Sequence, residues 1–332
     1  MEDSPTCHPR VVSLLPAATE IAAALGLRPH LVGRSHECDV PADVESLPAV
    51  TASRIDTSGP SRAIHEQVVE AGRAAGAVAP AAGAACGTGG SAPLFTLDID
   101  TLAALAPDVI LTQAACDVCA IAAADVEAAV RRAGVPTTVV SLAPARLTDL
   151  FTDILAVGRA TGRLARAREL VARLRARIAS LACRAGTFPD RPRVAVIEWL
   201  DPPMAAGNWV PEMVALAGGI DVLGTPGGHS HWVSWADVAR ADPDVVVLVP
   251  CGLTLDRVVA EAGAPAVRSH LEPLRAFRSG RVHAVDGHHL FNRPGPRLVD
   301  SLEVLAEILH PGRFAFPSRF VRRLPAGPTG AA

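Results

Sequence analysis

Cysteines in two separate segments have the spacing and chemistry to bind a metal. Cys116 and Cys119 are separated by two residues, which lets two thiolates bind one ion, and Cys38 could add a third thiolate. Three thiolates with a histidine or water suit Zn²⁺, and three thiolates alone suit an iron–sulfur cluster with one open iron. The alternative is that these are buried thiols, because cysteine is among the most buried residue types.

Histidine and tryptophan side chains follow several of the predicted strands. Each histidine alone is best explained as a surface or hydrogen-bonded loop residue, but their grouping favours at least one of them contacting a ligand. Trp209 and Trp232 offer flat apolar surfaces that could stack on a macrocycle, with ordinary packing between lobes as the equal alternative. The histidines in question are His36, His229, His231, His288 and His289.

Short β-branched runs alternate with helical patterns along the chain. Continuous apolar strands of this kind are typical of parallel sheets covered on both faces, and ligands bind beyond the carboxyl ends of such strands. The polar and aromatic residues just described would then line one region. The predicted strands are 11–15, 31–35, 109–113, 137–142, 194–200, 245–250 and 282–286.

One unit occurs twice in the same order. TLAALAPDVILTQ (101–113) and ADVARADPDVVVLV (236–249) both read as a short helix, Pro-Asp and a β-branched run. A strand, a proline-containing loop and a helix precede each copy, and a strand, a loop and a helix follow it. Such a repeat predicts two similar α/β lobes with a cleft between them.

The predicted architecture is α/β, with two Rossmann-like lobes of mainly parallel sheets joined by one long rigid helix. An Ala-, Leu- and Arg-rich segment without proline has the apolar spacing of such a helix, and Gly158 and Gly162 are the places where it could break. The expected divisions are a first lobe at 9–145 with a surface insertion at about 51–93, a linker helix at 146–186, a second lobe at 187–312 and a flexible tail at 313–332.

Composition excludes several classes of protein. The 332 residues are 49% hydrophobic and 20% charged with a net charge of −3 and no basic block, which gives nucleic-acid binding no electrostatic support. No apolar stretch approaches the roughly 20 residues that span a bilayer. The first residues do not read as a signal peptide, so we expect a cytoplasmic protein, or a periplasmic or other extracytoplasmic one if the start is misassigned. The chain also lacks the G-x-x-x-x-G-K-[ST] and G-x-S-x-G motifs.

The order of motifs resembles a known family. RVVSLLPAATEIAAALGL, VGRSHECDVP, LAALAPDVIL, a long helix and a second strand–PP–helix–AGG unit are similar to the substrate-binding proteins of iron-siderophore and vitamin B12 ABC transporters, and most similar to the cobalamin-binding branch. The resemblance covers about residues 10–310. It implies a metal chelate held between the lobes, little lobe closure and no enzymatic activity.

The resemblance also implies which residues line the cleft and which contact a transporter. The family docks on its permease through one acidic residue in each lobe; Asp100 matches the first, whereas the second falls on Ala236, one place from Asp237. The cysteine motifs and the insertion depart from the standard receptor. The cleft residues carried over are Pro16, His36, Asp39, Pro203, Asn208, Trp209, His231, Trp232, His288, Phe291 and Arg293.

Two functions follow from these patterns. The leading hypothesis is a binding protein for cobalamin or a related metal chelate, which an ABC transporter permease could accompany. The alternative is a cytoplasmic metal or iron–sulfur protein on the same scaffold, with Cys38, Cys116 and Cys119 as ligands. The sequence does not distinguish cobalamin from its precursors, a siderophore or haem.

Overall fold

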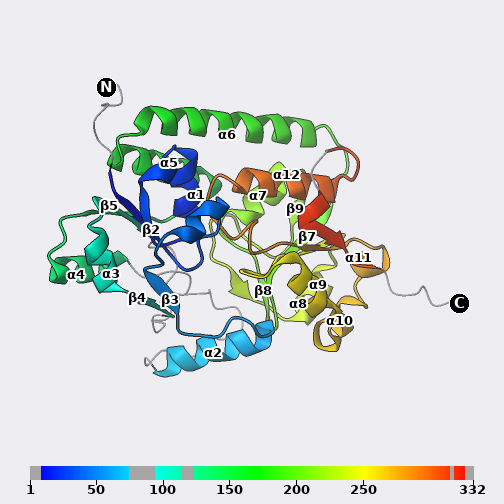
Figure 1. The fold of residues 1–332 in the computed structure, drawn as a ribbon. Helices are drawn as coiled ribbons and strands as arrows, with labels where there is room; N and C mark the ends of the chain where they lie inside the picture. The colour runs from blue at the N-terminus through cyan, green and yellow to red at the C-terminus, as the bar shows by residue number, and fades with distance from the viewer. Residues whose placement is uncertain (1–8, 75–93, 114–122, 315–317, 326–332) are drawn as a thin grey trace, which may run out of the picture.

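The computed structural model describes residues 9–74, 94–113, 123–314 and 318–325. Two α/β lobes lie side by side, with one long helix running along both of them (Figure 1). The predicted α/β class with two lobes is confirmed. All the predicted strands are present, within three residues at each end, because buried β-branched runs are hard to satisfy in any other conformation.

The first lobe is built on a parallel sheet in the order β2-β1-β5-β6. Its strands are β1 (Val11–Ser13), β2 (Leu31–Arg34), β5 (Val109–Gln113) and β6 (Thr138–Leu142). A separate antiparallel pair consists of β3 (Thr51–Ser53) and β4 (Phe95–Leu97). The helices are α1 (Pro16–Ala24), α2 (Ser61–Ala74), α3 (Ile99–Leu105), α4 (Ala123–Ala133) and α5 (Leu147–Ala160), with short 3₁₀ turns at Arg28–His30 and Ala42–Ser46.

The second lobe has a mixed sheet in the order β10-β8-β7-β11-β12-β13, with β9 also paired to β7. The strands are β7 (Arg193–Leu200), β8 (Pro203–Ala205), β9 (Ile220–Asp221), β10 (His231–Trp232), β11 (Val245–Leu248), β12 (Val282–Val285) and β13 (Val321–Arg323). The helices are α7 (Val210–Leu216), α8 (Trp235–Ala241), α9 (Leu255–Gly263), α10 (Pro265–Leu271), α11 (Arg275–Arg278) and α12 (Leu298–Leu309), and a 3₁₀ turn covers Ser318–Phe320.

The repeated unit has the same local structure in both lobes. Helices α3 and α8 each end at a left-handed residue, Ala106 with φ 41° and Asp242 with φ 42°. The aspartate of each Pro-Asp pair then accepts a hydrogen bond from a backbone N–H at the start of a central strand. Asp108 accepts from Arg10, just before β1, at 2.7 Å, and Asp244 accepts from Arg193, the first residue of β7, at 2.8 Å.

The connection between the lobes is α6 (Leu164–Ala185), a helix of 22 residues. The segment expected to be one helix over 146–186 is divided, because Gly162 adopts a left-handed φ of 69° and the chain turns there. Helix α5 packs on the first lobe beside β6 and α1, whereas α6 contacts α12 and α7 of the second lobe. The division falls at one of the two glycines where a break was expected.

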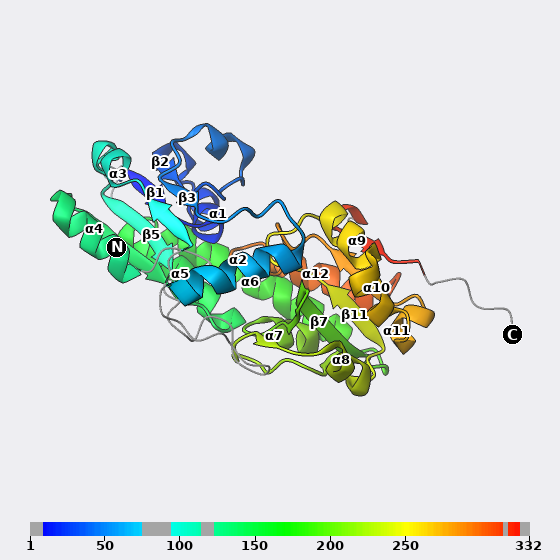
Figure 2. The same cartoon turned by 90° about the horizontal axis from the view of Figure 1, so that it is seen from below.

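Two segments differ from the sequence-based description. Within the stretch expected to be a flexible tail, β13 pairs with β12 and covers what would otherwise be an open sheet edge. Leu324 is buried there, so apolar packing holds this part of the tail. Within the expected surface insertion, α2 crosses between the lobes (Figure 2). In the described part of the chain, no helix is both long and apolar enough to cross a bilayer.

Candidate binding site between the lobes

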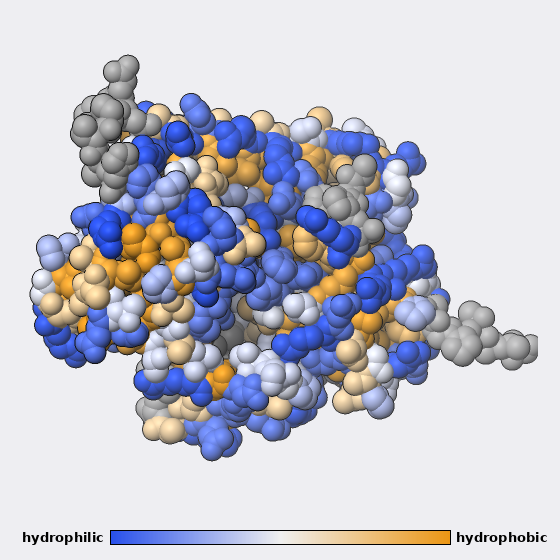
Figure 3. Space-filling model, in the orientation of Figure 1, coloured by the Kyte–Doolittle hydropathy of each residue, from blue (hydrophilic) through white to orange (hydrophobic). Residues whose placement is uncertain are grey.

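A cluster of charged side chains joins the two lobes. Asp39 follows β2, and its Oδ2 lies 2.6 Å from Nε2 of His288, in the loop between β12 and α12. Arg293 of the same loop donates to the other carboxylate oxygen of Asp39, with 2.5 Å between Nη1 and Oδ1. Both loops lie at the carboxyl ends of parallel strands, as expected for a ligand site. The surface is recessed between the lobes, with hydrophilic residues around the recess (Figure 3).

The neighbouring His289 extends this cluster. Its Nδ1 lies 3.2 Å from each carboxylate oxygen of Asp286, and its Nε2 lies 3.5 Å from Oδ2 of Asp39. Hydrogen bonds to Asp286 and Asp39 raise the pKa of His289 to about 9. Burial raises the pKa of Asp39, but hydrogen bonds from His288, His289 and Arg293 outweigh it and hold that pKa well below its usual range. Asp39 is therefore ionised at neutral pH.

A second ion pair lies behind this cluster. Glu20 of α1 has a side chain only 4% exposed, and it accepts two hydrogen bonds from Arg297, Nε to Oε2 at 2.9 Å and Nη2 to Oε1 at 2.5 Å. Nη1 of Arg293 lies 3.6 Å from Oε1 of Glu20. Glu20 thus offers Arg293 a second partner besides Asp39, and the two lobes are held together by charge-assisted bonds.

The loop that carries these histidines has a strained backbone. Phe291 is buried with φ 64°, a conformation that bulky residues rarely adopt. Its N–H donates to Oγ of Ser301 at 2.9 Å, and its carbonyl accepts from Nε1 of Trp209 at 2.7 Å. Trp209 is 8% exposed, so it anchors this loop and packs in the core. This geometry favours the packing interpretation of Trp209 over stacking on a ligand.

Two predicted site residues of the first lobe have internal partners. Nδ1 of His36 lies 2.7 Å from Oγ1 of Thr51, and its ring packs on Phe95 with centroids 5.3 Å apart. Burial lowers the pKa of His36. The Cys38 thiol is buried and accepts a hydrogen bond from Oγ1 of Thr19 at 3.0 Å, and burial raises its pKa to about 11. Cys38 is therefore a neutral thiol at physiological pH.

Helix α2 covers one side of the region between the lobes. His65 meets the ring of Trp232 edge-on, with centroids 4.8 Å apart, and Nε1 of Trp232 is buried without a hydrogen-bond partner. Because this segment is tied to the second lobe, it is more than a surface insertion. The polar contacts at the start of the helix are Ser61 with Glu261 and Arg62 with Asp201.

The remaining predicted cleft residues lie at the ends of the expected elements. Pro16 is the first residue of α1, and Pro203 is buried at the start of β8. His231 pairs with Ala205 where β10 lies antiparallel to β8. Asn208 is left-handed, with φ 52°, which asparagine tolerates well.

The structure describes both proposed docking residues but only one of the three proposed cysteine ligands. Asp100 is exposed in the first turn of α3. Asp237 lies in the matching turn of α8, where its carboxylate accepts hydrogen bonds from the N–H and hydroxyl of Ser234 and pairs with Arg240 at 2.6 Å. Those hydrogen bonds lower the pKa of Asp237 to about 2. Cys116 and Cys119 lie outside the described residues, so the three-cysteine site stays a prediction.

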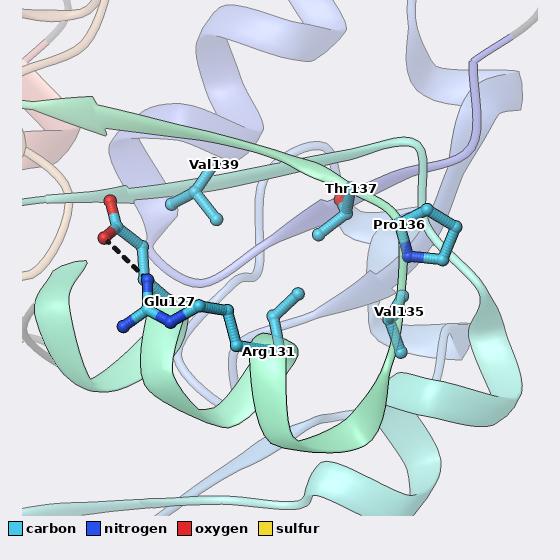
Figure 4. A pocket seen from close by; sticks show the side chains of 7 residues that line it. Glu127, Arg131, Val135, Pro136, Thr137 and Val139 are labelled. Atoms are coloured by element: carbon cyan, nitrogen blue, oxygen red, sulfur yellow. Dashed lines mark hydrogen bonds and ion pairs between the residues drawn. The ribbon is translucent and has the colours of Figure 1, made fainter.

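A pocket elsewhere in the first lobe is not part of this region. It lies between α4 and β6, at the end of the lobe away from the second lobe (Figures 1 and 4). Its lining combines valine and proline side chains with Thr137 and an exposed ion pair of 3.5 Å between Glu127 and Arg131. It lacks the convergent polar groups that fix a ligand's orientation.

Three residues of the cluster and of the ion pair behind it were not predicted from the sequence, and a fourth, His289, was not among the predicted site residues. Glu20 was the one charge in an otherwise apolar helical run, which is a signal of a buried ion pair. Asp286 and Arg297 flank the predicted loop without any pattern of their own. His289 was recognised as one of several strand-end histidines, yet nothing in the sequence distinguished it from the others.

Comparisons with known proteins identify a family and a relative that cover most of the chain. The sequence model of the family described as "Periplasmic binding protein" matches residues 11–271. An uncharacterized ABC transporter substrate-binding lipoprotein of Bacillus subtilis, YvrC, is 24% identical over 309 residues, which cover 92% of this chain and 81% of the relative.

Solved structures share the fold. The haem-binding protein RhuT of Roseiflexus sp. RS-1 aligns with a TM-score of 0.64 at 24% identity, covering 92% of this chain and 99% of the other. The vitamin B12 binding protein BtuF of Vibrio cholerae aligns with a TM-score of 0.63 at 20% identity, covering 91% and 96%. A haem-binding protein of Pseudomonas aeruginosa aligns with a TM-score of 0.69 at 21% identity, covering 96% of this chain and 99% of the other. These similarities confirm the expected architecture.

Proposed function

Because this chain belongs to the periplasmic binding protein family, whose members are substrate-binding transport proteins and not enzymes, we propose that it holds a metal chelate between its two lobes. The observation that carries the proposal is the convergence of Asp39, His288 and Arg293 at the carboxyl ends of strands from both lobes. A chelate with polar substituents would meet hydrogen-bonding groups from each side there.

We propose cobalamin as the first chelate to test and haem as the second. Solved relatives named for vitamin B12 and for haem have the same fold. Trp232, half-buried with its indole N–H unpartnered, could pack against the flat face of either ligand. His231 or His288 could replace an axial water on the metal, and Arg293 could hydrogen-bond to side groups of the macrocycle.

We further propose that the chain works with an ABC transporter permease from an extracytoplasmic location. The lipoprotein and periplasmic proteins that resemble it support this location over the cytoplasmic one. Asp100 on α3 would contact the permease from the first lobe, and Asp237 on the equivalent helix α8 would do so from the second. The repeated local structure around α3 and α8 supports this pairing.

The alternative, a metal or iron–sulfur protein that uses Cys38, Cys116 and Cys119, has weaker support. Burial keeps the Cys38 thiol protonated, whereas metal ligation requires the thiolate. Metal analysis of anaerobically purified protein tests this alternative. Iron with sulfide, or zinc, that is present in the parent chain and lost in Cys116→Ser would support it.

An absorption titration with hydroxocobalamin tests the leading proposal, with haemin titrated in parallel. A saturable one-to-one shift of the corrin bands is expected. Trp232→Ala should weaken binding by about 1–3 kcal/mol if this ring packs on the ligand. The control is His270→Ala, an exposed histidine that stacks on Trp235 away from the cluster. Absence of any shift with either compound would overturn the proposal.

A further inference from the structure

Three metal-binding side chains from two lobes converge on one point. One ligand atom from each of Asp39, His288 and His289 lies within 4.8 Å of the other two, and Oδ2 of Asp39 faces Nε2 of both histidines. We propose that these residues form a site for a free divalent transition-metal ion of the Zn²⁺ or Co²⁺ type. The site would bind the ion directly, and it shares Asp39 and His288 with the proposed chelate site.

The spacing of the ligand atoms fits such an ion. Two ligands at about 2.0–2.1 Å from a metal lie about 2.9 Å apart at right angles and about 3.4 Å apart in a tetrahedron. The distances from Oδ2 of Asp39 to the Nε2 atoms of His288 and His289, 2.6 and 3.5 Å, lie on either side of this interval. Side-chain adjustments of a few tenths of an ångström would therefore bring Oδ2 of Asp39 into range of each histidine nitrogen, and the two histidine nitrogens, which lie within 4.8 Å of each other, would approach by rotation of the rings.

The side chains behind the ligands hold them as metal ligands are usually held. Asp286 fixes His289 from behind, accepting from its backbone N–H at 2.8 Å and facing its Nδ1 at 3.2 Å, which turns Nε2 toward Asp39. Arg293 donates to both carboxylate oxygens of Asp39, Nη1 to Oδ1 at 2.5 Å and Nη2 to Oδ2 at 3.2 Å, so the longer contact would give way when Oδ2 binds the ion. A carboxylate behind a histidine and a hydrogen bond to the ligating carboxylate are both common around bound metals.

Nε2 of His288 lies close to both an acceptor and a donor, and it cannot form a favourable hydrogen bond with both. Its Nε2 lies 2.6 Å from Oδ2 of Asp39 and 3.0 Å from Nη2 of Arg293. A protonated Nε2 faces the guanidinium donor, and an unprotonated Nε2 faces the carboxylate oxygen, so one contact is repulsive in either state. A cation between Nε2 and Oδ2 would remove the conflict, because Arg293 has Glu20 as a second partner 3.6 Å away.

The local charge also favours a divalent cation. Four carboxylates, those of Glu20, Glu37, Asp39 and Asp286, act on this region, and the guanidinium groups of Arg293 and Arg297 oppose them. Once the ion has displaced the proton from His289, two negative charges remain for the ion to balance. Two nitrogens and one carboxylate oxygen suit borderline ions such as Zn²⁺ and Co²⁺ better than Mg²⁺ or Ca²⁺.

The experiment is a Co²⁺ titration of the full chain, prepared without a polyhistidine tag and stripped with EDTA. It is followed by visible absorption at about pH 8, where the metal must displace the proton that the hydrogen bonds to Asp286 and Asp39 favour on His289. We expect one Co²⁺ per chain with visible d–d bands, displacement by Zn²⁺ and a higher unfolding temperature with Zn²⁺. Nitrogen and oxygen ligation gives no sulfur-to-cobalt charge-transfer band in the near ultraviolet.

Variants decide whether these residues are the ligands. Asp39→Asn and His289→Ala should each weaken Co²⁺ binding at least about tenfold, and His270→Ala should not change it. Asp286→Asn keeps every ligand and should still weaken binding about tenfold, which covers the case in which a ligand variant does not fold. Unchanged affinity in His289→Ala and Asp286→Asn, or a near-ultraviolet band that Cys116→Ser abolishes, would overturn the site. The hydroxocobalamin titration is a separate readout, so either proposal can fail alone.

Discussion

At the scale of single residues, buried carboxylates determine how the lobes are joined and how stability depends on pH. Glu20 and Asp153 are both nearly inaccessible to solvent, at 5% and 8% exposed. Glu20 has two guanidinium groups near it, whereas Oδ2 of Asp153 has no hydrogen-bond partner. Replacing Glu20 by a neutral residue should therefore lower the stability of the protein, whereas replacing Asp153 should raise it.

Replacing Glu20 by Gln should destabilise the protein by about 3 kcal/mol, because it removes the counter-charge of the half-buried Arg297 and the second partner of the buried Arg293. The matched control is Glu127→Gln, which removes an exposed pair with Arg131 and should change stability by less than about 1 kcal/mol. Urea unfolding of both variants and the parent chain measures the difference. Equal losses of unfolding free energy in the two variants would show that the Glu20 pair stabilises the protein no more than an exposed ion pair does.

Replacing Asp153 by Asn should stabilise the protein at about pH 8 by about 2 kcal/mol. Burial raises the pKa of Asp153 from 3.8 to about 7, so the folded state binds the proton more tightly than the unfolded state. The contribution of this group is then fully present at low pH and is lost as the pH rises from 3.8 to about 7. The stability difference between Asp153→Asn and the parent should shrink toward about pH 4, and a pH-independent difference would contradict this assignment.

At the scale of elements, the α5–α6 hairpin determines how the connecting helix leaves the first lobe. Gly162 is left-handed, with open space where a Cβ would lie. Gly158 has an ordinary backbone conformation, but a Cβ there would lie 2.5 Å from Cβ of Ala167. The two glycines are therefore needed for different reasons, backbone conformation at one and close packing at the other.

Substituting each glycine separates these reasons. Gly162→Ala should destabilise the protein by about 1 kcal/mol through backbone strain alone. Gly158→Ala should destabilise it by about 3 kcal/mol through overpacking, and adding Ala167→Gly should recover part of the loss. Thermal or urea unfolding of the three variants tests this. A double variant no more stable than Gly158→Ala alone would show that the contact with Ala167 is not the cause.

At the scale of the whole molecule, the two lobes share one apolar core. A continuous cluster of buried side chains includes Val11 and Leu111 of the first sheet and Val194 and Val245 of the second. It lies under α6 together with α1, α5, α7 and α12. Separate domains move by default unless a large apolar interface joins them. This shared core, with the ion pairs and α2 across the cleft, is consistent with the little lobe closure expected from the sequence.

The shared core predicts that both lobes unfold in one transition. The four tryptophans, Trp199, Trp209, Trp232 and Trp235, all lie in the second lobe, so their fluorescence reports on that lobe alone. Far-ultraviolet circular dichroism reports on the helices of both. The two probes should give the same urea midpoint. A fluorescence midpoint that differs from the dichroism midpoint would mean that the lobes unfold separately.

The sequence by itself determined the elements and their order. Strands, the repeated α–Pro-Asp–β unit and the break near Gly162 depend on hydrophobic period and on residues with special backbone preferences, both of which are local. It also placed Asp39, His288 and Arg293 in strand-end loops, since parallel sheets present their carboxyl ends together.

Only the tertiary structure decided which of these side chains meet. Asp39 and His288 are 249 residues apart in the chain, and their contact depends on how α6 sets one lobe against the other. The same long-range packing made Trp209 an anchor for the histidine loop, brought α2 across the cleft and paired β13 with the open edge of β12. Side-chain partners of this kind depend on the orientation of distant elements, which local patterns do not encode.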